Sequence, residues 1–320
     1  MAVYTEVSGE ELEEFVAQYE IGRVASFKGI AEGVENSNFL LQTDRGVYIL
    51  TLYEKRVAPE DLPYFLALMD HLAAQGFACP TPIHARDGQA LRELCGRPAA
   101  IVSFLSGVCA KRIAPRHCAA LGRAMATMHI AAQSFRPVRR NDLSVAGWQS
   151  LFAATRDRAD EVQPGLAEEV GRELDALAGA WPTGLENGVI HADLFPDNVF
   201  FLGEELSGII DFYFACNDAL AYDIAICLNA WCFEPDLSFN VTKARQLLTG
   251  YAEVRPLDKA EIGAMPLLAR GAAMRFLLTR LYDWLNHPEG AYVSPKDPLE
   301  YLRRLRFHRS VRGPRAYGFA

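Results

Sequence analysis

The segment from residue 191 to residue 211 contains the side chains best suited to chemistry. His191, Asp193 and Asn198 lie within one octapeptide, HADLFPDN, and Asp211 follows at the end of an apolar run. This spacing is typical of phosphoryl-transfer sites, in which an Asp accepts the proton of the acceptor hydroxyl while a later Asn and Asp bind Mg2+. We therefore expect Asp193 and His191 to be catalytic, and Asn198 and Asp211 to be metal ligands.

The residues around the octapeptide are typical of a loop between two strands. Val189-Ile190 leads into it and Val199–Phe201 follows it. A short loop of this kind can direct one carboxylate at a nucleophile while its end turns an amide oxygen toward a metal. Each polar residue also has an ordinary structural explanation, His191 as a buried core histidine and the others as turn residues. The combination with Asp211 is what favours catalysis.

A second candidate segment is the glycine-bearing run GIAEGVENSN at residues 29–38. Glycines let backbone N–H groups approach phosphate oxygens, and hydroxyl or amide side chains can donate further hydrogen bonds. A plain hairpin loop also uses glycine and asparagine, so that alternative stays open. The candidate nucleotide-binding residues are Gly29, Gly33, Asn36, Ser37, Asn38, Lys55 and Phe104.

The first part of the chain predicts a short helix followed by three antiparallel strands. Ser8 begins a capping-box sequence, and the residues after it are apolar at helical spacing. The sequence then changes to β-prone stretches separated by turn residues. The expected strands are residues 24–27, 38–42 and 47–53.

A crossing helix and a hinge are expected next. Pro59 suits the first position of a helix that ends near Gly76. Asp87-Gly88 predicts the turn of a further hairpin. Residues 99–105 read as a buried strand that leads into a candidate hinge at Ser106-Gly107.

Beyond the hinge the patterns become mainly helical. Helices are expected around residues 121–129, twice within 145–180, from 219 onward and near 299–307, with short strands around the octapeptide. We therefore predict an α+β, two-lobed fold. Residues 1–105 would form an N-lobe with an antiparallel sheet and helices, and residues 106–320 a mainly helical C-lobe.

Composition excludes several classes of partner. The net charge of −8 gives no global positive field to hold nucleic acid or an anionic membrane. The seven cysteines are scattered without metal-ligand spacing and predict reduced thiols. The acidic N-terminus and the lack of a long uncharged apolar run predict a cytoplasmic protein. A small-molecule substrate is expected, and the oligomeric state is left open.

These features together resemble the aminoglycoside phosphotransferase and choline kinase superfamily, a protein-kinase-like fold, over nearly the whole chain. The runs GVENSNFLLQTDRGVYILTLYEK and DFYFACNDALAYDIAICLNAWCFE are similar to bacterial type II homoserine kinases. The resemblance implies ATP and Mg2+ as cofactors, with ATP between the two lobes. It also implies phosphorylation of L-homoserine to O-phospho-L-homoserine, a step of threonine biosynthesis.

The resemblance also implies one bracing residue and exposes one departure. Asp223 resembles the family's Asp that braces the catalytic loop, and a helix cap explains it equally well. Kinase-like folds commonly place a Lys or Arg on the third strand to hold the α- and β-phosphates, but Thr51 occupies that slot. Lys55 or Lys28 is a candidate replacement, and each is also explained as a solvated lysine.

The acceptor pocket is expected on the helices after Asp211. An amino acid acceptor needs one anionic contact and one cationic or N–H-rich contact. The candidates are Asn229, Trp231, Arg275 and Tyr282, which an amphipathic helix surface also explains. Residues 266–315 contain nine Arg and one Lys against four acidic residues, which disfavours a polycationic aminoglycoside.

Three interpretations therefore remain open from the residues. The first is a small-molecule kinase for homoserine, or for a choline-like, methylthioribose or aminoglycoside acceptor. The second is a metal-dependent phosphohydrolase with His191, Asp193 and Asp211 as ligands. The third is a nucleotide-binding regulator without catalysis, which only the Thr51 slot supports.

Overall fold

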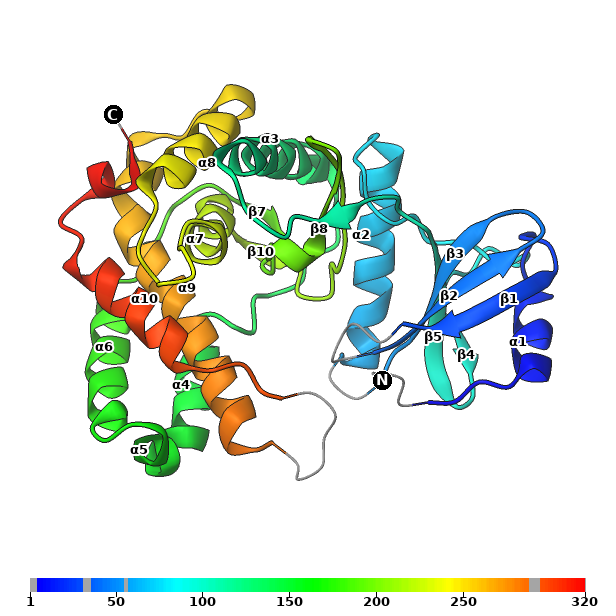
Figure 1. The fold of residues 1–320 in the computed structure, drawn as a ribbon, viewed down its shortest axis with the longest axis horizontal. Helices are drawn as coiled ribbons and strands as arrows, with labels where there is room; N and C mark the ends of the chain where they lie inside the picture. Colours follow the sequence, from blue (N-terminus) through cyan, green and yellow to red (C-terminus); the bar gives the residue numbers. More distant parts are fainter. Residues whose placement is uncertain (1–4, 31–35, 55–56, 288–293, 320) are drawn as a thin grey trace. The chain divides into compact units, whose positions relative to one another are not determined.

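The computed structural model describes residues 5–30, 36–54, 57–287 and 294–319. These residues form two compact units, and Figure 1 labels most of their elements. The first unit extends to Gly107 and also includes Phe135–Pro137 and Ser207–Tyr213, and the remaining described residues form the second.

The first unit is built on a five-stranded antiparallel sheet with the strand order β1-β2-β3-β5-β4. Its elements are α1 (Gly9–Val16), β1 (Val24–Gly29), β2 (Ser37–Thr43), β3 (Val47–Leu52), α2 (Leu62–Ala74), β4 (Arg92–Leu94) and β5 (Arg97–Ser103). Buried positions alternate along β2, as expected where one face of a sheet is covered. The three strands predicted before residue 54 are confirmed.

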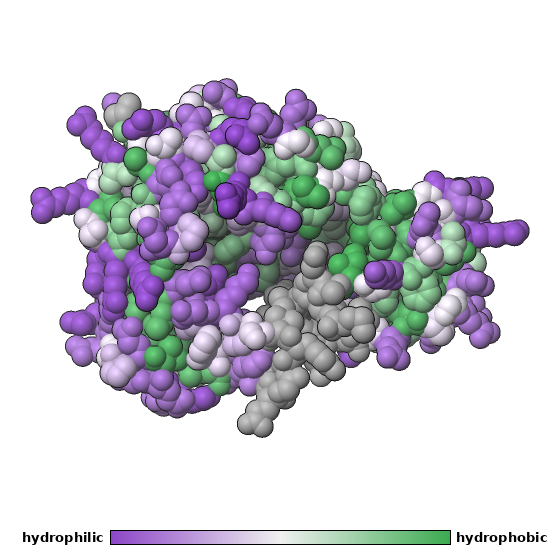
Figure 2. All heavy atoms as spheres, viewed as in Figure 1, coloured by the Kyte–Doolittle hydropathy of each residue, from purple (hydrophilic) through white to green (hydrophobic). Residues whose placement is uncertain are grey.

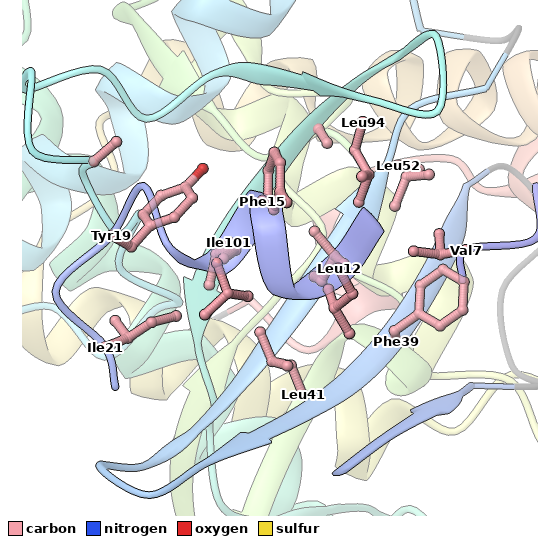
Figure 3. Close-up of a cluster of buried hydrophobic side chains, with 14 residues drawn as sticks. Val7, Leu12, Phe15, Tyr19, Ile21, Phe39, Leu41, Leu52, Leu94 and Ile101 are labelled. Carbon is pink, nitrogen blue, oxygen red and sulfur yellow. The ribbon is translucent and has the colours of Figure 1, made fainter. Parts of the chain in front are cut away.

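Helix α1 covers part of this sheet and closes the core of the first unit. Its predicted capping box is present, because the Ser8 hydroxyl accepts from Glu11 N and the Glu11 carboxylate accepts from Ser8 N. Leu12 and Phe15 of α1 gather with Leu41 and other strand residues (Figure 3). Burial of these apolar side chains stabilises the unit mainly through the hydrophobic effect.

Two local features of the first unit differ from the sequence prediction. Pro59 begins a 3-10 turn and not the α-helix, which starts at Leu62. A turn is present at Asp87-Gly88, but the hairpin of β4 and β5 lies across Cys95 and Gly96. Both hairpin residues have positive φ, +52° and +70°, as the tightest hairpin turns require. A cysteine is not a usual residue for this conformation, so the sequence signal was weak.

The second unit is mainly helical, as predicted. Its helices are α3 (Pro115–Ala131), α4 (Val145–Thr155), α5 (Ala159–Val162), α6 (Leu166–Ala180), α7 (Leu220–Trp231), α8 (Val241–Val254), α9 (Lys259–Leu285) and α10 (Leu299–Ser310). Its short strands are β6 (Val108–Cys109), β7 (Asn187–Ile190), β8 (Val199–Leu202) and β10 (Cys216–Ala219), and β9 (Glu205–Ile209) carries the chain into the first unit.

Two strand pairs of the second unit frame the octapeptide. β7 enters it and pairs with β10, and β8 leaves it and pairs with β6, both antiparallel. β10 was not predicted, because its sequence Cys-Asn-Asp-Ala has little β propensity. Its pairing with the buried β7 supplies the structure that its own residues do not specify.

The surface and the thiols agree with the composition. Hydrophilic residues cover much of the visible face of the second unit (Figure 2). None of the seven cysteines forms a disulfide, and five of them are buried. No helix within the described ranges is both long and apolar enough to cross a membrane.

Helices α3 and α8 approach each other closely at a reciprocal pair of glycines. A Cβ atom on Gly122 would lie 2.2 Å from the Leu247 carbonyl oxygen, and one on Gly250 would lie 2.2 Å from that of Ala119. Both contacts are with backbone, which cannot rotate away as a side chain can. The two helices therefore need glycine at both positions.

We expect Gly250→Ala to destabilise the second unit by at least about 1–3 kcal/mol, because the new methyl group forces α3 and α8 apart. Gly263→Ala in α9 is the matched control, because no atom lies within 4 Å of its added Cβ. The control should be neutral or stabilise by up to about 1 kcal/mol, since alanine favours helix more than glycine does. Urea unfolding measures both, and equal stability of the two variants would contradict the packing argument.

Candidate active site

The octapeptide forms a compact loop in the second unit. His191 is fully buried, Asn198 is nearly so and Asp193 is half-buried. The Asn198 amide nitrogen donates to the Asp193 backbone oxygen at 2.8 Å and to the Asp193 carboxylate at 3.2 Å. These donations fix the amide, so that its oxygen Oδ1 points away from both acceptors. A fixed amide oxygen that takes no part in these two hydrogen bonds fits a hard divalent cation, which prefers oxygen ligands.

Asp223 holds the start of this loop through its backbone. The Asp223 carboxylate accepts from His191 N and from Ala192 N, each at 2.8 Å. Asp223 lies inside α7, whose N-cap is Ala219, so the helix-cap explanation does not apply. The carboxylate is fully buried, and burial by itself would raise its pKa. The hydrogen bond from His129 and the interactions with His191 outweigh burial and lower the pKa of Asp223.

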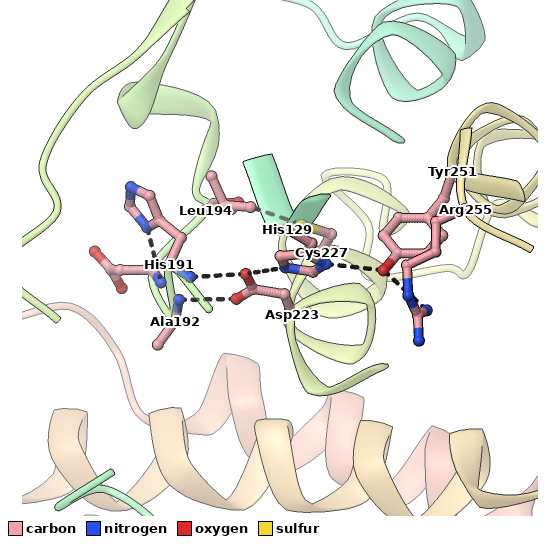
Figure 4. A network of polar contacts seen from close by, with 9 residues as sticks. His129, His191, Ala192, Leu194, Asp223, Cys227, Tyr251 and Arg255 are labelled. Carbon is pink, nitrogen blue, oxygen red and sulfur yellow. Dashed lines mark hydrogen bonds and ion pairs between the residues drawn. The ribbon is translucent and has the colours of Figure 1, made fainter. Parts of the chain in front are cut away.

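A polar chain continues from Asp223 through the core of the second unit (Figure 4). His129 Nε2 lies 3.1 Å from the Asp223 carboxylate, and His129 Nδ1 lies 2.8 Å from the Tyr251 hydroxyl. Arg255 donates to the same hydroxyl at 3.1 Å, which leaves the Tyr251 proton to point at Nδ1. Burial raises the pKa of Tyr251 and keeps it a neutral donor. The chain therefore supplies Nε2–H of His129 to Asp223.

The sequence did not identify His129, Tyr251 or Arg255 as parts of the site. His129 shares the helical spacing of the apolar residues around it, which predicts only a buried face. Nothing in the sequence pattern links a histidine on α3 to a tyrosine on α8. Only the packing of those helices brings the two side chains to the octapeptide loop.

Ala192 has a backbone conformation that is held from both sides. Its φ of +64° lies in the left-handed region, which costs a residue with a side chain about 1–2 kcal/mol. Its N–H donates to Asp223, and its carbonyl accepts from the Arg275 guanidinium. Such strain persists where the surroundings over-determine it, and it is frequent in active sites.

Arg275 and Trp231 contact the loop backbone and not a solvent-accessible pocket. Arg275 is 1% exposed, and its guanidinium lies over the rings of Phe276 and Phe214. Trp231 is fully buried, and its indole N–H donates to the Leu194 carbonyl at 2.7 Å. Both were expected as acceptor contacts. Both side chains are instead buried and donate to backbone carbonyls of the loop.

The other two expected acceptor residues are also placed differently. Asn229 is fully buried and donates to two helix carbonyls, those of Ala225 and Ala269. Its oxygen lies 3.1 Å from Nε2 of the buried His308. The amide is therefore fully used within the core. Tyr282 lies on α9 and is 42% exposed.

Asp211 belongs to the first unit, where two tyrosines lie beside it. The hydroxyl groups of Tyr53 and Tyr213 are 3.0 Å apart. Burial raises the pKa of Tyr213 to about 12, and the charge of Asp211 adds to the rise in both phenols. Both tyrosines therefore stay neutral. Asp211 itself has a φ of +66°, a second strained position in a residue expected to bind metal.

The polar residues after the glycine-bearing run are engaged within the first unit. Ser37 is fully buried, and its hydroxyl donates to the Glu54 carboxylate at 2.7 Å. The Asn36 oxygen accepts from Glu54 N, and the Asn38 oxygen accepts from the Thr51 hydroxyl at 2.8 Å. These contacts stabilise the pairing of β2 with β3 and engage the Ser37 hydroxyl, which was expected to contact phosphate.

The remaining candidates for nucleotide binding are only partly described. Gly29 ends β1, and Phe104 follows β5 with 44% of its surface exposed. Gly33 and Lys55 lie outside the described residues. Thr51 is buried in β3, so this strand position carries no cation.

Comparison with known proteins places this site in a family. Residues 26–257 match the model of a phosphotransferase enzyme family. Homoserine kinase of Paramagnetospirillum magneticum is 66% identical over 99% of this chain and 99% of its own. Homoserine kinase of Rhodospirillum rubrum is 64% identical over the full length of both chains.

Solved structures show the same fold at low sequence identity. An amicoumacin kinase in complex with AMP-PNP, Ca2+ and Ami has a TM-score of 0.73 at 14% identity, covering 96% of this chain and 95% of its own. Choline kinase of Cryptosporidium parvum has a TM-score of 0.67 at 14% identity, covering 94% of each chain. The protein-kinase-like fold predicted from the sequence is thereby confirmed. The chain belongs to the phosphotransferase enzyme family.

Proposed function

We propose that this protein transfers the γ-phosphoryl group of ATP to the hydroxyl of L-homoserine, giving O-phospho-L-homoserine for threonine biosynthesis. The observation that carries the proposal is the octapeptide loop, in which Asp193 and Asn198 are in contact and the backbone is held by Asp223, Arg275 and Trp231. Relatives named homoserine kinase, 63–66% identical over nearly the whole chain, supply the acceptor. We assign nucleotide binding to residues 1–105 and acceptor binding to residues 106–320.

In this proposal Asp193 orients the acceptor hydroxyl and takes its proton. The hydroxyl oxygen forms a bond to the γ-phosphorus while the bond to the ADP oxygen breaks. Transfer of this kind asks the protein mainly for position and for neutralisation of charge. Asp193 provides the positioning. It is half-buried, and the hydrogen bonds to the loop backbone leave its carboxylate little conformational freedom. His191 was expected to be catalytic. Because it is fully buried and its Nδ1 accepts from Asp193 N at 3.2 Å, we assign it the role of positioning the loop.

Asn198 and Asp211 are the proposed ligands of the Mg2+ that accompanies the nucleotide. Mg2+ in nucleotide sites keeps several waters and uses one or two protein carboxylates together with phosphate oxygens. The fixed Asn198 amide oxygen and the Asp211 carboxylate beside two neutral phenols fit this small set of oxygen donors. Mg2+ would neutralise charge on the phosphates during transfer.

The phosphohydrolase alternative has no support in the contacts of the loop. It requires His191 as a metal ligand, but this side chain is fully buried and its Nδ1 faces Asp193 N. Within the described ranges, no group of three His, Cys, Asp or Glu side chains is placed to hold a metal ion.

Asp193→Asn should lower kcat by about 100- to 10,000-fold, because the amide cannot accept the hydroxyl proton. The KM for ATP should stay within about threefold, since the group acts on the acceptor. Asp197→Asn is the matched control, an exposed carboxylate in the same loop that should retain near-native kcat. Coupled ADP-release kinetics with L-homoserine measure kcat and the KM for ATP in both variants. A near-native kcat in Asp193→Asn would refute the assignment.

Asp211→Ala should remove the Mg2+-dependent part of nucleotide binding, because the cation loses a carboxylate ligand. Calorimetric titration with ADP, with and without Mg2+, measures that part directly. Binding in EDTA serves as the internal control and should be equal in the two proteins. An unchanged Mg2+ effect in the variant would count against Asp211 as a ligand.

Asp223→Asn should lower both stability and kcat, because one of the two carboxylate oxygens that accept loop N–H groups becomes a donor. A buried charge network broken on one side typically costs about 3–5 kcal/mol. Urea unfolding gives the stability loss, and kcat is measured at a temperature where the variant is still folded. A folded variant with native kcat would show that the carboxylate does not position the loop.

A further inference from the structure

Arg304 differs from those arginines of the last two helices that pair with a carboxylate. Arg275 also has an unpartnered Nε, but its guanidinium donates to the Ala192 carbonyl. Arg280 pairs with Glu300 at 2.8 Å, Arg270 pairs with Glu173 at 2.6 Å, and Arg306 pairs with Glu169. Arg304 is half-buried, and in the described part of the chain no carboxylate pairs with it. Its Nε atom is fully buried and makes no hydrogen bond there.

Aromatic rings surround the Arg304 guanidinium. Its central carbon lies 4.5 Å from the ring centre of Tyr301 and 5.4 Å from that of Phe233. Contacts with ring faces offset only part of the cost of removing a cation from water. The aromatic rings therefore hold the Arg304 cation, but the described residues supply no carboxylate to pair with it.

A continuous line of rings joins Arg304 to the catalytic loop. Phe195, two residues after Asp193, lies 4.9 Å from Phe276, and Phe276 lies 5.3 Å from Tyr301, measured between ring centres. Tyr301 in turn contacts Arg304. The candidate base and the unpaired cation thus lie at the two ends of one aromatic wall in the second unit.

Electrostatics at Tyr301 involve both ends of this line of rings. Burial raises the pKa of Tyr301 to about 12, the charges of Arg304 and Arg280 act against the rise, and the Asp193 carboxylate adds to it. The same phenol therefore senses both the guanidinium and the catalytic carboxylate.

We propose that Arg304 binds the α-carboxylate of the acceptor while Asp193 holds the hydroxyl at the other end. The inference rests on the proposed function, because it assumes that the acceptor is a hydroxyl amino acid. A planar guanidinium can hold a carboxylate through two parallel hydrogen bonds. Arg304 then selects hydroxyl amino acids over amino alcohols that lack the carboxylate.

Two fragments of homoserine separate the two ends of the site. L-2-Aminobutyrate keeps the α-carboxylate and lacks the hydroxyl, whereas 3-amino-1-propanol keeps the hydroxyl and lacks the carboxylate. Each is tested as a competitive inhibitor against L-homoserine in the wild-type protein and in Arg304→Met. Charge-assisted hydrogen bonds of this kind change affinity by about 10- to 100-fold.

We expect Arg304→Met to raise the inhibition constant of L-2-aminobutyrate and the KM for L-homoserine by about 10- to 100-fold. The inhibition constant of 3-amino-1-propanol and the KM for ATP should change by less than about threefold. Arg304→Lys should recover part of the lost affinity, because it restores the charge without the planar donor pair.

Arg303→Met is the matched control, because Arg303 is an exposed arginine on the same helix. It should leave every constant near its wild-type value. Equal changes for both fragments in Arg304→Met, or no change for either, would overturn the assignment of Arg304. A wild-type protein that does not phosphorylate L-homoserine would overturn the proposed function itself, so the two failures are distinct.

Discussion

One buried carboxylate determines the geometry on which the rest of the site depends. Asp223 accepts from two successive backbone N–H groups, those of His191 and Ala192, in a fully desolvated position. A buried charge of this kind is stable only with a complete set of donors, and His129 supplies the remaining one. Because the donors lie on α3 and on the loop, the carboxylate ties three separate segments of the second unit into one geometry.

The loop is held at its carbonyls as firmly as at its N–H groups. Arg275 donates to the Ala192 carbonyl, the Asn198 amide to that of Asp193, and Trp231 to that of Leu194. Three consecutive carbonyls are therefore fixed by side chains from different elements. This explains how a half-buried Asp193 can keep one orientation, which phosphoryl transfer requires more than it requires a strong base.

Polar groups in the first unit serve a different purpose. Ser37, Asn38 and Thr51 satisfy one another or Glu54 between neighbouring strands, and Thr51 occupies the strand position where kinase-like folds commonly carry a cation. Residues that look suitable for phosphate binding in the sequence are thus part of the sheet's own hydrogen bonding. In the second unit, by contrast, Arg304 is a cation for which the described residues offer rings and no anion.

Four features could be predicted from the sequence: the capping box at Ser8, the alternating strands, the helical second part and the spacing of Asp193 and Asn198. Each is encoded in residues that lie close together along the chain. The sequence also led to Arg275 and Trp231, but with the wrong partners, since a sequence does not say whether a polar side chain faces solvent or a buried carbonyl. The β4–β5 turn at Cys95 and Gly96, strand β10, the His129–Tyr251–Arg255 chain and the place of Arg304 were decided only by tertiary structure. Their physical reason is common to all: each depends on contacts between segments far apart in sequence, whose energies exceed local propensity.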